Sequence, residues 1–193
     1  YGISGALTQI NADGTETEGG ETTNASVDNL TVIPSIFVEF QSGGITYGLD
    51  YIPMDADVSD KTKKRTDTET SVTGTVTSTT TSRTQEAQAE LSNHLTLYAN
   101  MMIGDTMFIK AGVAMVTLDT KESLGTGSKY GNEDIYGGVF GLGFADGNSR
   151  YELVYTDYED INLTSSVART GVTTNNKISA DLDTLALKYS YVF

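Results

Sequence analysis

The residues that first suggest chemistry lie within one short alternating segment. His94 is the only histidine of the chain, and Ser92 and Glu90 precede it at intervals of two. Serine, histidine and a carboxylate are the residue types of nucleophilic catalysis. In a β-strand, however, residues two apart lie about 7 Å apart, too far for a hydrogen bond between nucleophile and base. We therefore expect a polar histidine that faces the interior of the fold, in a protein that is not an enzyme, with a hydrolase or an aspartyl-type protease as the alternative.

Two acidic clusters offer the hard oxygen ligands that calcium prefers. They are Asp55, Asp57 and Asp60 in one connection, and Asp157, Glu159 and Asp160 in another. Neither has the spacing of an EF-hand loop, and acidic runs are commonly just solvated. We predict no metal site and no cofactor, and leave open whether these acidic loops hold calcium.

A basic cluster opens the most unusual stretch of the sequence. It consists of Lys61, Lys63, Lys64 and Arg65, which could bind the phosphates of lipopolysaccharide. A Ser/Thr-rich run over 66–84 follows it. This run is either a polar loop without regular structure or a β-hairpin that turns at Gly74, because Thr and Val favour strands.

Composition excludes several classes of protein. The chain has 193 residues, 12 Lys+Arg against 26 Asp+Glu, a net charge of −14 and no cysteine. Such acidity argues against a nucleic-acid partner. The lack of cysteine excludes a disulfide framework and a thiolate zinc site. No apolar run approaches the roughly 20 residues of a transmembrane helix.

The elements that position these residues are eight segments with apolar residues at every second position. This period of two is typical of strands whose two faces meet different environments. The segments are 1–7, 30–40, 45–51, 91–101, 107–115, 136–144, 151–155 and 185–193.

The connections between the segments alternate strictly in length. Short turns rich in glycine lie at 41–44, 103–106 and 146–149, and long polar connections at 13–28, 57–86, 119–133 and 159–177. All short turns, and both ends of the chain, then fall on one side. We predict an all-β fold over 1–193: an eight-stranded antiparallel up-and-down transmembrane β-barrel with three short periplasmic turns and four long extracellular loops.

The two prolines fit a closed sheet poorly, because proline cannot donate a ladder hydrogen bond. Pro34 lies in the middle of a predicted strand, and Pro53 near the end of another. We expect a β-bulge near Pro34, and at Pro53 the outer rim of the barrel, where pairing loosens.

The eight segments, the unequal loops and the final Tyr189-Ser190-Tyr191-Val192-Phe193 resemble the small outer-membrane β-barrels, the class of the OmpA transmembrane domain, OmpX and the opacity-type proteins. In that class a C-terminal aromatic residue is the signal for the barrel-assembly machinery. The resemblance therefore implies that Phe193, with Tyr191 and Tyr189, is the assembly signal and part of an aromatic girdle.

Charged residues of both signs occupy the polar positions of the segments. In an eight-stranded barrel, whose interior is just wide enough to be filled by side chains, they would meet inside and must be paired. We predict a structural network that leaves no open pore, with a gated ion path as the alternative, and expect Lys188 to pair with Glu39, Asp50 or Glu152. The network comprises Glu39, Asp50, Lys110, Arg150, Glu152 and Lys188.

The function predicted from these features is a structural or surface-interaction role in a bacterial outer membrane, such as adhesion, lattice contacts or a receptor, carried by the long loops. The expected partners are outer-membrane lipid, lipopolysaccharide, the assembly machinery and a surface ligand or a second copy of the chain. Two alternatives remain: a small porin or channel, and a soluble secreted β-barrel binding protein in which the apolar face points inward.

Overall fold

The computed structural model describes residues 1–18, 20–59, 63–73, 77–123, 129–167 and 174–193. Within the strands, the side chains of 63, 65, 67–73, 77–83, 85 and 87 lie outside this description. None of the described residues forms a helix that could cross a membrane.

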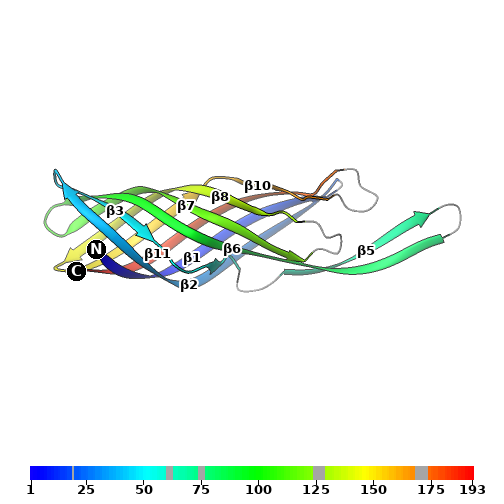
Figure 1. Ribbon diagram of the computed structural model, residues 1–193, viewed down its shortest axis with the longest axis horizontal. Helices are drawn as coiled ribbons and strands as arrows, with labels where there is room; N and C mark the ends of the chain where they lie inside the picture. The colour runs from blue at the N-terminus through cyan, green and yellow to red at the C-terminus, as the bar shows by residue number, and fades with distance from the viewer. Residues whose placement is uncertain (19, 60–62, 74–76, 124–128, 168–173) are drawn as a thin grey trace.

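Eight strands form a closed antiparallel ring, in the order β1-β2-β3-β6-β7-β8-β9-β11, with β11 pairing back onto β1 (Figure 1). This confirms the predicted eight-stranded antiparallel barrel. The ring strands are β1 (Gly2–Glu18), β2 (Glu21–Ser42), β3 (Ile45–Tyr51), β6 (Thr77–Ile103), β7 (Met107–Ser123), β8 (Asn132–Asp146), β9 (Ser149–Tyr158) and β11 (Lys177–Val192).

Among the described residues, three further strands lie outside the ring. β4 (Ala56–Asp57) and β5 (Lys63–Thr73) both pair with β6, and β10 (Ile161–Thr164) pairs with β11 beyond the end of β9. The Ser/Thr-rich stretch therefore contains a β-hairpin of β5 and β6, which projects past the barrel in Figure 1. The expected turn at Gly74 lies outside the described residues.

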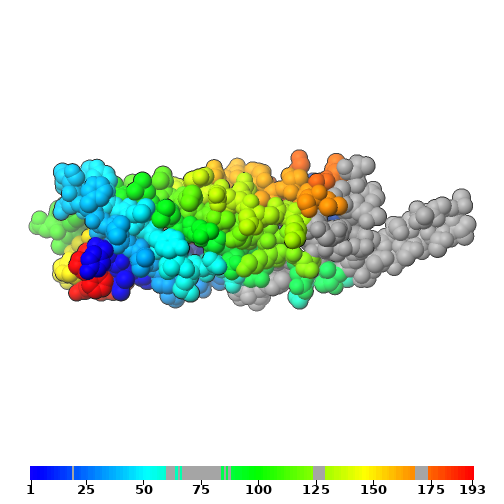
Figure 2. Space-filling model, in the orientation of Figure 1, coloured from blue at the N-terminus to red at the C-terminus, as the bar shows by residue number. Residues whose placement is uncertain are grey.

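We call the end of the barrel with the three tight turns the short-turn end, and the opposite end the long-loop end. Gly43, Gly44, Gly104 and Gly147 give the short turns positive φ angles, which glycine adopts without steric cost. Figure 2 shows the whole as an elongated cylinder, with the first and last residues together near the short-turn end.

The outer surface near the short-turn end is an apolar belt. Leu187, Val32 and Phe140 are 62%, 70% and 54% exposed. Side chains on the opposite parity of the same strands point inward and include buried Ser35, Asp50 and Glu152. This arrangement, apolar outside and polar inside, is that of a transmembrane barrel.

The polarity reverses towards the long-loop end. There the interior holds a cluster of buried apolar side chains, and the outer face is polar. The apolar cluster comprises Ile10, Val58, Leu91, Ala114, Val116, Leu118, Ile135, Val139, Tyr158, Ile161, Leu163 and Leu182. Exposed Asp13, Asp157 and Asp181 lie on the outer face.

The predicted strand limits were wrong at this end. The expected loop 13–28 is a continuation of β1 and β2, which pair from Gly2–Phe37 to Glu18–Glu21. The connections 119–133 and 159–177 are also partly strand. The reason is the reversed polarity, because Asp13 and Asp28 face water beyond the apolar belt and therefore suit a strand there.

The expected bulge near Pro34 was wrong as well. Pro34 pairs in register with Gly5 of β1, and β3 has already ended at Tyr51, opposite Ile36. The proline thus lies where β2 has one neighbour fewer in the ladder. Pairing does loosen at Pro53, which follows the end of β3, but the expected rim was wrong there, because β1 and β2 continue as far as Glu18–Glu21 and Ala56 pairs again with β6.

A register shift occurs instead in β6, between Ser92 and Leu95. Asn93 has φ of 53° there, a left-handed conformation that asparagine tolerates better than most residues. The shift exchanges the two faces of the strand. Leu91, predicted on the outer face with Leu97, is therefore buried in the apolar cluster.

Candidate functional site

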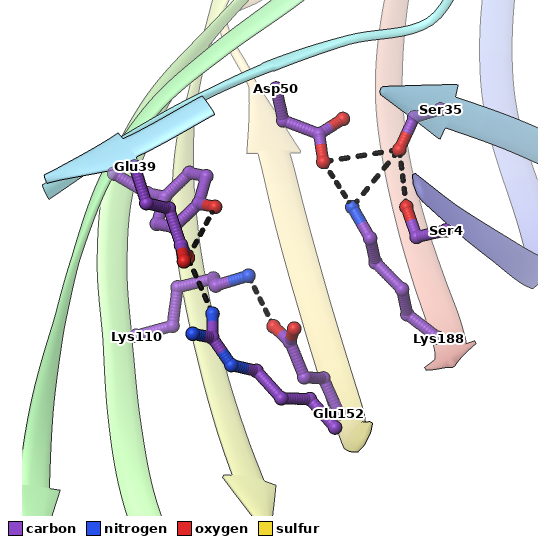
Figure 3. Close-up of polar contacts among 9 residues, drawn as sticks. Ser4, Ser35, Glu39, Asp50, Lys110, Glu152 and Lys188 are labelled. Carbon is purple, nitrogen blue, oxygen red and sulfur yellow. Dashed lines mark hydrogen bonds and ion pairs between the residues drawn. The ribbon is translucent and has the colours of Figure 1, made fainter. Parts of the chain in front are cut away.

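The six charged residues predicted for the interior come together there as three ion pairs (Figure 3). Lys110 pairs with Glu152, and Lys188 with Asp50. Arg150 pairs with Glu39 at 2.5 Å. Each pair joins two strands, and Figure 3 shows the side chains pointing toward one another across the lumen. Their functional role stays a prediction.

Neutral polar groups extend this network. The Tyr98 hydroxyl donates to Glu39 at 2.9 Å, and its ring lies 4.2 Å from the Lys110 ammonium, a cation–π contact. The Ser35 hydroxyl donates to Asp50 at 3.1 Å and lies 2.5 Å from the Ser4 hydroxyl. The predicted network left out Tyr98, Ser4 and Ser35, although all three occupy inward positions of alternating segments.

Glycines make room for interior aromatic rings, as at Tyr98 and Phe108. A Cβ added at Gly48 would lie 2.2 Å from the ring of Tyr98, and one at Gly143 would lie 2.1 Å from that of Phe108. The inward positions of β3 and β8 therefore accept an aromatic ring from a neighbouring strand. This close packing fills the lumen at the level of the ion pairs.

A cavity of about 100 Å³ lies between the ion pairs and the apolar cluster. Its polar side is formed by Asp50, Lys110, Lys188 and the pair His94–Tyr158. Its apolar side includes Ile10, Leu91, Val116, Val139 and Val154. The cavity thus joins the two chemically different parts of the interior.

His94 faces this cavity, as predicted for an inward polar histidine. Its Nε2 lies 3.0 Å from the hydroxyl of Tyr158. Ser92, expected on the same face, instead donates to Asp119 at 2.6 Å, because the register shift at Asn93 exchanges the faces. Glu90 pairs with Lys121. The three residues that suggested catalysis are thus engaged with different partners.

The aromatic residues predicted for the girdle lie on one side of the short-turn end, on β11 and directly after it. Phe193 stacks on Tyr1 at 5.6 Å between ring centroids and contacts the edge of Tyr191 at 5.2 Å. Tyr189 lies 5.2 Å from Tyr151. The backbone N–H of Phe193 also donates to the Tyr1 carbonyl at 2.9 Å. The role of these residues in assembly stays a prediction.

The predicted phosphate-binding cluster is described only in part. Lys64 is exposed and pairs with Glu86 at 2.6 Å. Lys61 lies outside the described residues, as do the side chains of Lys63 and Arg65.

The acidic loops give little support for calcium within the described ranges, where no group of three or more histidines and acids is placed to hold a metal ion. Asp60 lies outside those ranges.

Near the long-loop end, the hydroxyl of Tyr130 donates a hydrogen bond to Glu16 at 3.0 Å. Burial, and then the charge of Glu16, raise the pKa of Tyr130 above its usual value.

Comparison with known proteins identifies solved structures with a similar fold. No protein-family model matches the chain, and no curated protein matches its sequence. Among solved structures, the outer membrane protein AlkL in lipid bilayers aligns with a TM-score of 0.54 at 15% identity, over all of this chain and 90% of that one. OprG from Pseudomonas aeruginosa aligns with a TM-score of 0.53 at 9% identity, over 98% and 95% of the two chains.

These likenesses confirm the predicted resemblance at the level of fold. The chain has the architecture of the small outer-membrane β-barrels. At such low identities the likeness concerns the fold alone, so the particular role must be argued from the residues of this chain.

Proposed function

We propose that this protein is a non-enzymatic outer-membrane barrel that does not conduct solutes and acts through its long-loop end, in a structural or surface-interaction role. The observation that carries this proposal is the set of three ion pairs across the lumen. The side chains of Lys110 and Glu152 are only 6% and 3% exposed. A charge network packed to this degree supports a closed interior rather than a pore.

Conductance in planar bilayers tests this proposal against the channel alternative. The wild-type chain is expected to give no discrete steps. A variant with Lys110→Ala, Glu152→Ala, Glu39→Ala and Arg150→Ala removes two of the three pairs and is expected to open a conducting path. Lys64→Ala with Glu86→Ala is the matched control, because that pair lies outside the lumen. Discrete conductance by the wild type would contradict the proposal.

A second part of the proposal concerns orientation and partners. We place the short turns and both termini in the periplasm and the long loops outside the cell, as in other barrels with unequal connections. In this orientation the basic cluster Lys61, Lys63, Lys64 and Arg65 reaches the lipopolysaccharide layer, and the aromatic residues Tyr189, Tyr191 and Phe193 meet the assembly machinery.

A contact with lipopolysaccharide should raise the melting temperature of the protein, which can be measured. The chain is inserted into phosphatidylcholine vesicles with and without lipopolysaccharide, and its melting is followed by gel mobility. We expect a higher melting temperature with lipopolysaccharide, a gain lost when all four basic residues are changed to Gln. Lys121→Gln is the control, because Lys121 lies on a different strand. An equal gain in the fourfold variant would rule out this contact.

The environment of His94 supports the non-enzymatic part of the proposal. Its ring lies inside the barrel against Tyr158, whereas Ser92 is bound to Asp119 on the other face. A His94→Gln variant is expected to leave any lipid or peptide cleavage by the preparation unchanged. Cleavage that is abolished in this variant would instead point to a hydrolase.

A further inference from the structure

We infer that a polar hollow on the outer wall of the barrel binds an amino sugar, a pyranose ring with a free amine, carried by the glycolipids that surround the protein. The choice of glycolipid as the source rests on the proposed function, in which the long loops lie outside the cell. The hollow itself is defined by the register of β11, β1 and β2, by the charges on this wall and by its size.

Residues that lie side by side on β11, β1 and β2 form rows across the outer wall, and these rows change from apolar to polar. The last row of the apolar belt contains Leu185, Gln9 and Leu30. Polar rows follow toward the long-loop end: Asp183–Asn11–Asp28, Asp181–Asp13–Ser26 and Ser179–Thr15–Asn24. All of these polar side chains are short, so the wall offers many hydrogen-bonding groups close to the backbone.

The last two of these rows line an open hollow of about 500 Å³. The polar residues of its lining are Asp13, Thr15, Asn24, Ser26, Ser179 and Asp181. Pockets that bind small molecules usually measure about 300–1,000 Å³. The hollow therefore has room for a sugar ring, unlike the interior cavity of about 100 Å³.

Two carboxylates face each other in the hollow. Asp13 and Asp181 lie directly opposite across the β1–β11 ladder, and like charges in this position destabilise a sheet. Neither carboxylate forms an ion pair or a hydrogen bond with any residue that the structure describes. The nearest basic residue on β11, Lys177, lies four positions from Asp181, or about 13 Å along the strand. A ligand with a positive charge between the two carboxylates would offset their repulsion.

Neutral groups beside the carboxylates complement the hydroxyls of a sugar. The hydroxyl of Thr15 donates to Oδ1 of Asn24 at 2.9 Å, which leaves the NH₂ group of this amide to donate to a ligand. The hydroxyls of Ser26 and Ser179 can both donate and accept. An amino sugar matches this set, with its amine toward the carboxylates and its hydroxyls toward the amide and the serines.

A bare metal ion and a linear amine match the hollow less well. Within the described parts of the chain, no group of three or more histidines and acids is placed to hold a metal ion. A linear polyamine would meet the carboxylates of Asp13 and Asp181 but has no hydroxyls for Asn24, Ser26 and Ser179. The mixture of charged and neutral groups therefore favours a sugar that bears an amine.

The position of the hollow indicates where the sugar comes from. Asp13 lies four positions beyond Gln9 of the last belt row, or about 13 Å along β1. The hollow is thus continuous with the lipid-facing belt. In the proposed orientation this level lies just outside the hydrocarbon of the outer leaflet, where the sugars of lipopolysaccharide begin. The polar rows contain no basic residue, so lipid phosphate is left to the basic cluster.

Binding of a soluble amino sugar tests the inference directly. The full chain in a non-ionic detergent is titrated with a short oligomer of glucosamine, and the heat of binding is measured. We expect saturable binding that is lost when the amines of the oligomer are acetylated. Spermidine, a linear amine without hydroxyls, should bind at least about tenfold more weakly, because it leaves the neutral hydrogen bonds of the hollow unmade.

Matched variants assign this binding to the hollow. Asp13→Asn with Asp181→Asn should weaken it at least about tenfold, because charge-assisted hydrogen bonds are lost. Asp119→Asn with Asp134→Asn is the control, because it removes the same charge from the outer wall on β7 and β8. Asn24→Ala should weaken the binding of the glucosamine oligomer but not that of spermidine. Gel mobility with and without heating verifies that each variant is folded.

Vesicles identify the source of the sugar. The chain is inserted into phosphatidylcholine vesicles with a lipopolysaccharide that bears free amino sugars, or with the same lipopolysaccharide after acetylation of its amines. The untreated form should raise the melting temperature more than the acetylated form, and this difference should vanish when Asp13 and Asp181 are changed to Asn. The fourfold Gln variant of the basic cluster should keep the difference, which separates this site from the phosphate contact.

Several results would overturn the inference. A lack of saturable binding by the wild type would mean that the hollow is not a site. Equal binding of the acetylated oligomer or of spermidine would show that no amino sugar is recognised. An equal loss in the control variant of Asp119 and Asp134 would reduce the effect to net charge. Equal protection by acetylated lipopolysaccharide would exclude the surrounding glycolipid. The conductance experiment is independent of all of these results.

Discussion

The two halves of the barrel expose opposite kinds of side chain on their outer faces, because one half faces lipid and the other faces water. Near the short-turn end, apolar side chains such as Leu187 face outward, and charged ones such as Lys188 face inward. Near the long-loop end, Asp181 faces outward and Leu182 is buried. Both pairs of residues belong to β11, so one strand is lipid-facing along part of its length and water-facing along the rest.

The comparison shows that two properties of a strand are independent. One is the alternation of its side chains between the two faces, and the other is which of the two faces is apolar. In β1 the side chains alternate without interruption from Gly2 to Glu18, with Leu7 outside and Ile10 inside. Towards the long-loop end, apolar residues occupy the inward positions and polar residues the outward positions. The environment outside the barrel, rather than the backbone, decides which face is apolar.

The largest effect is expected from separating the charges of the lipid-facing half. Glu152→Gln leaves Lys110 buried without its counter-ion, which should cost about 3–5 kcal/mol of the free energy of unfolding. Urea unfolding in vesicles, followed by gel mobility, measures this loss. The double variant Lys110→Met with Glu152→Gln should recover part of it. A single variant as stable as the wild type would mean that the network does not hold this half together.

The second largest effect is expected from truncating an isoleucine, which should lower the free energy of unfolding much more in the long-loop half than in the lipid-facing half. Ile10→Ala opens a space in the buried cluster of the long-loop half and should cost about 2–5 kcal/mol. Ile3→Ala on the same strand is the control, because Ile3 is 52% exposed and only exchanges side-chain contacts for lipid. The same urea titration measures both. Equal losses for Ile3→Ala and Ile10→Ala would contradict the reversal of polarity along β1.

An arginine on the outer face tests which solvent each half meets. Leu187→Arg introduces a charge into the apolar belt and should cost about 2–4 kcal/mol near the middle of a bilayer. Asp181→Arg should cost little, because Asp181 is exposed and lies opposite Asp13, so the change also removes a like-charge contact. The stability of both variants is compared in vesicles. A small effect of Leu187→Arg would favour the soluble-barrel alternative.

The smallest effect concerns the register shift that lies between the halves. Asn93→Val places a β-branched residue at φ of 53° and should cost about 1–2 kcal/mol. Asn93→Gly, which accepts this conformation freely, should be close to neutral. Thermal melting in detergent ranks the two variants. If Asn93→Val were the more stable variant, β6 would not need the left-handed residue.

The sequence allowed the lipid-facing half to be predicted in detail. Its eight segments, its three short turns and the inward position of the six charges follow from a period of two and from glycine-rich turns. The particular ion pairs did not follow, since three partners were open for Lys188 and the structure pairs it with Asp50. Pairing across a lumen depends on strand register, which alternation alone leaves undefined.

The long-loop half was harder to recognise for a physical reason. Polar residues such as Asp13 and Asp28 favour a loop in the sequence, although the residue that precedes each of them on the inward face, Ala12 and Val27, packs against the buried apolar cluster. The side chains at Ser92 and His94 were misassigned to one face because a single left-handed residue exchanges faces without a glycine to mark it. A search for alternation of either polarity would have found the longer strands.

The pairing of β1 with β11 has a consequence for how the chain reaches its membrane. This ladder joins Gly2 to Val192, and such distant partners make ring closure a slow, late step of folding. Until β11 is in place, at least one strand edge stays open, and open edges pair readily with other chains. We therefore expect a chain whose last strand is not yet paired to aggregate more readily than the closed barrel.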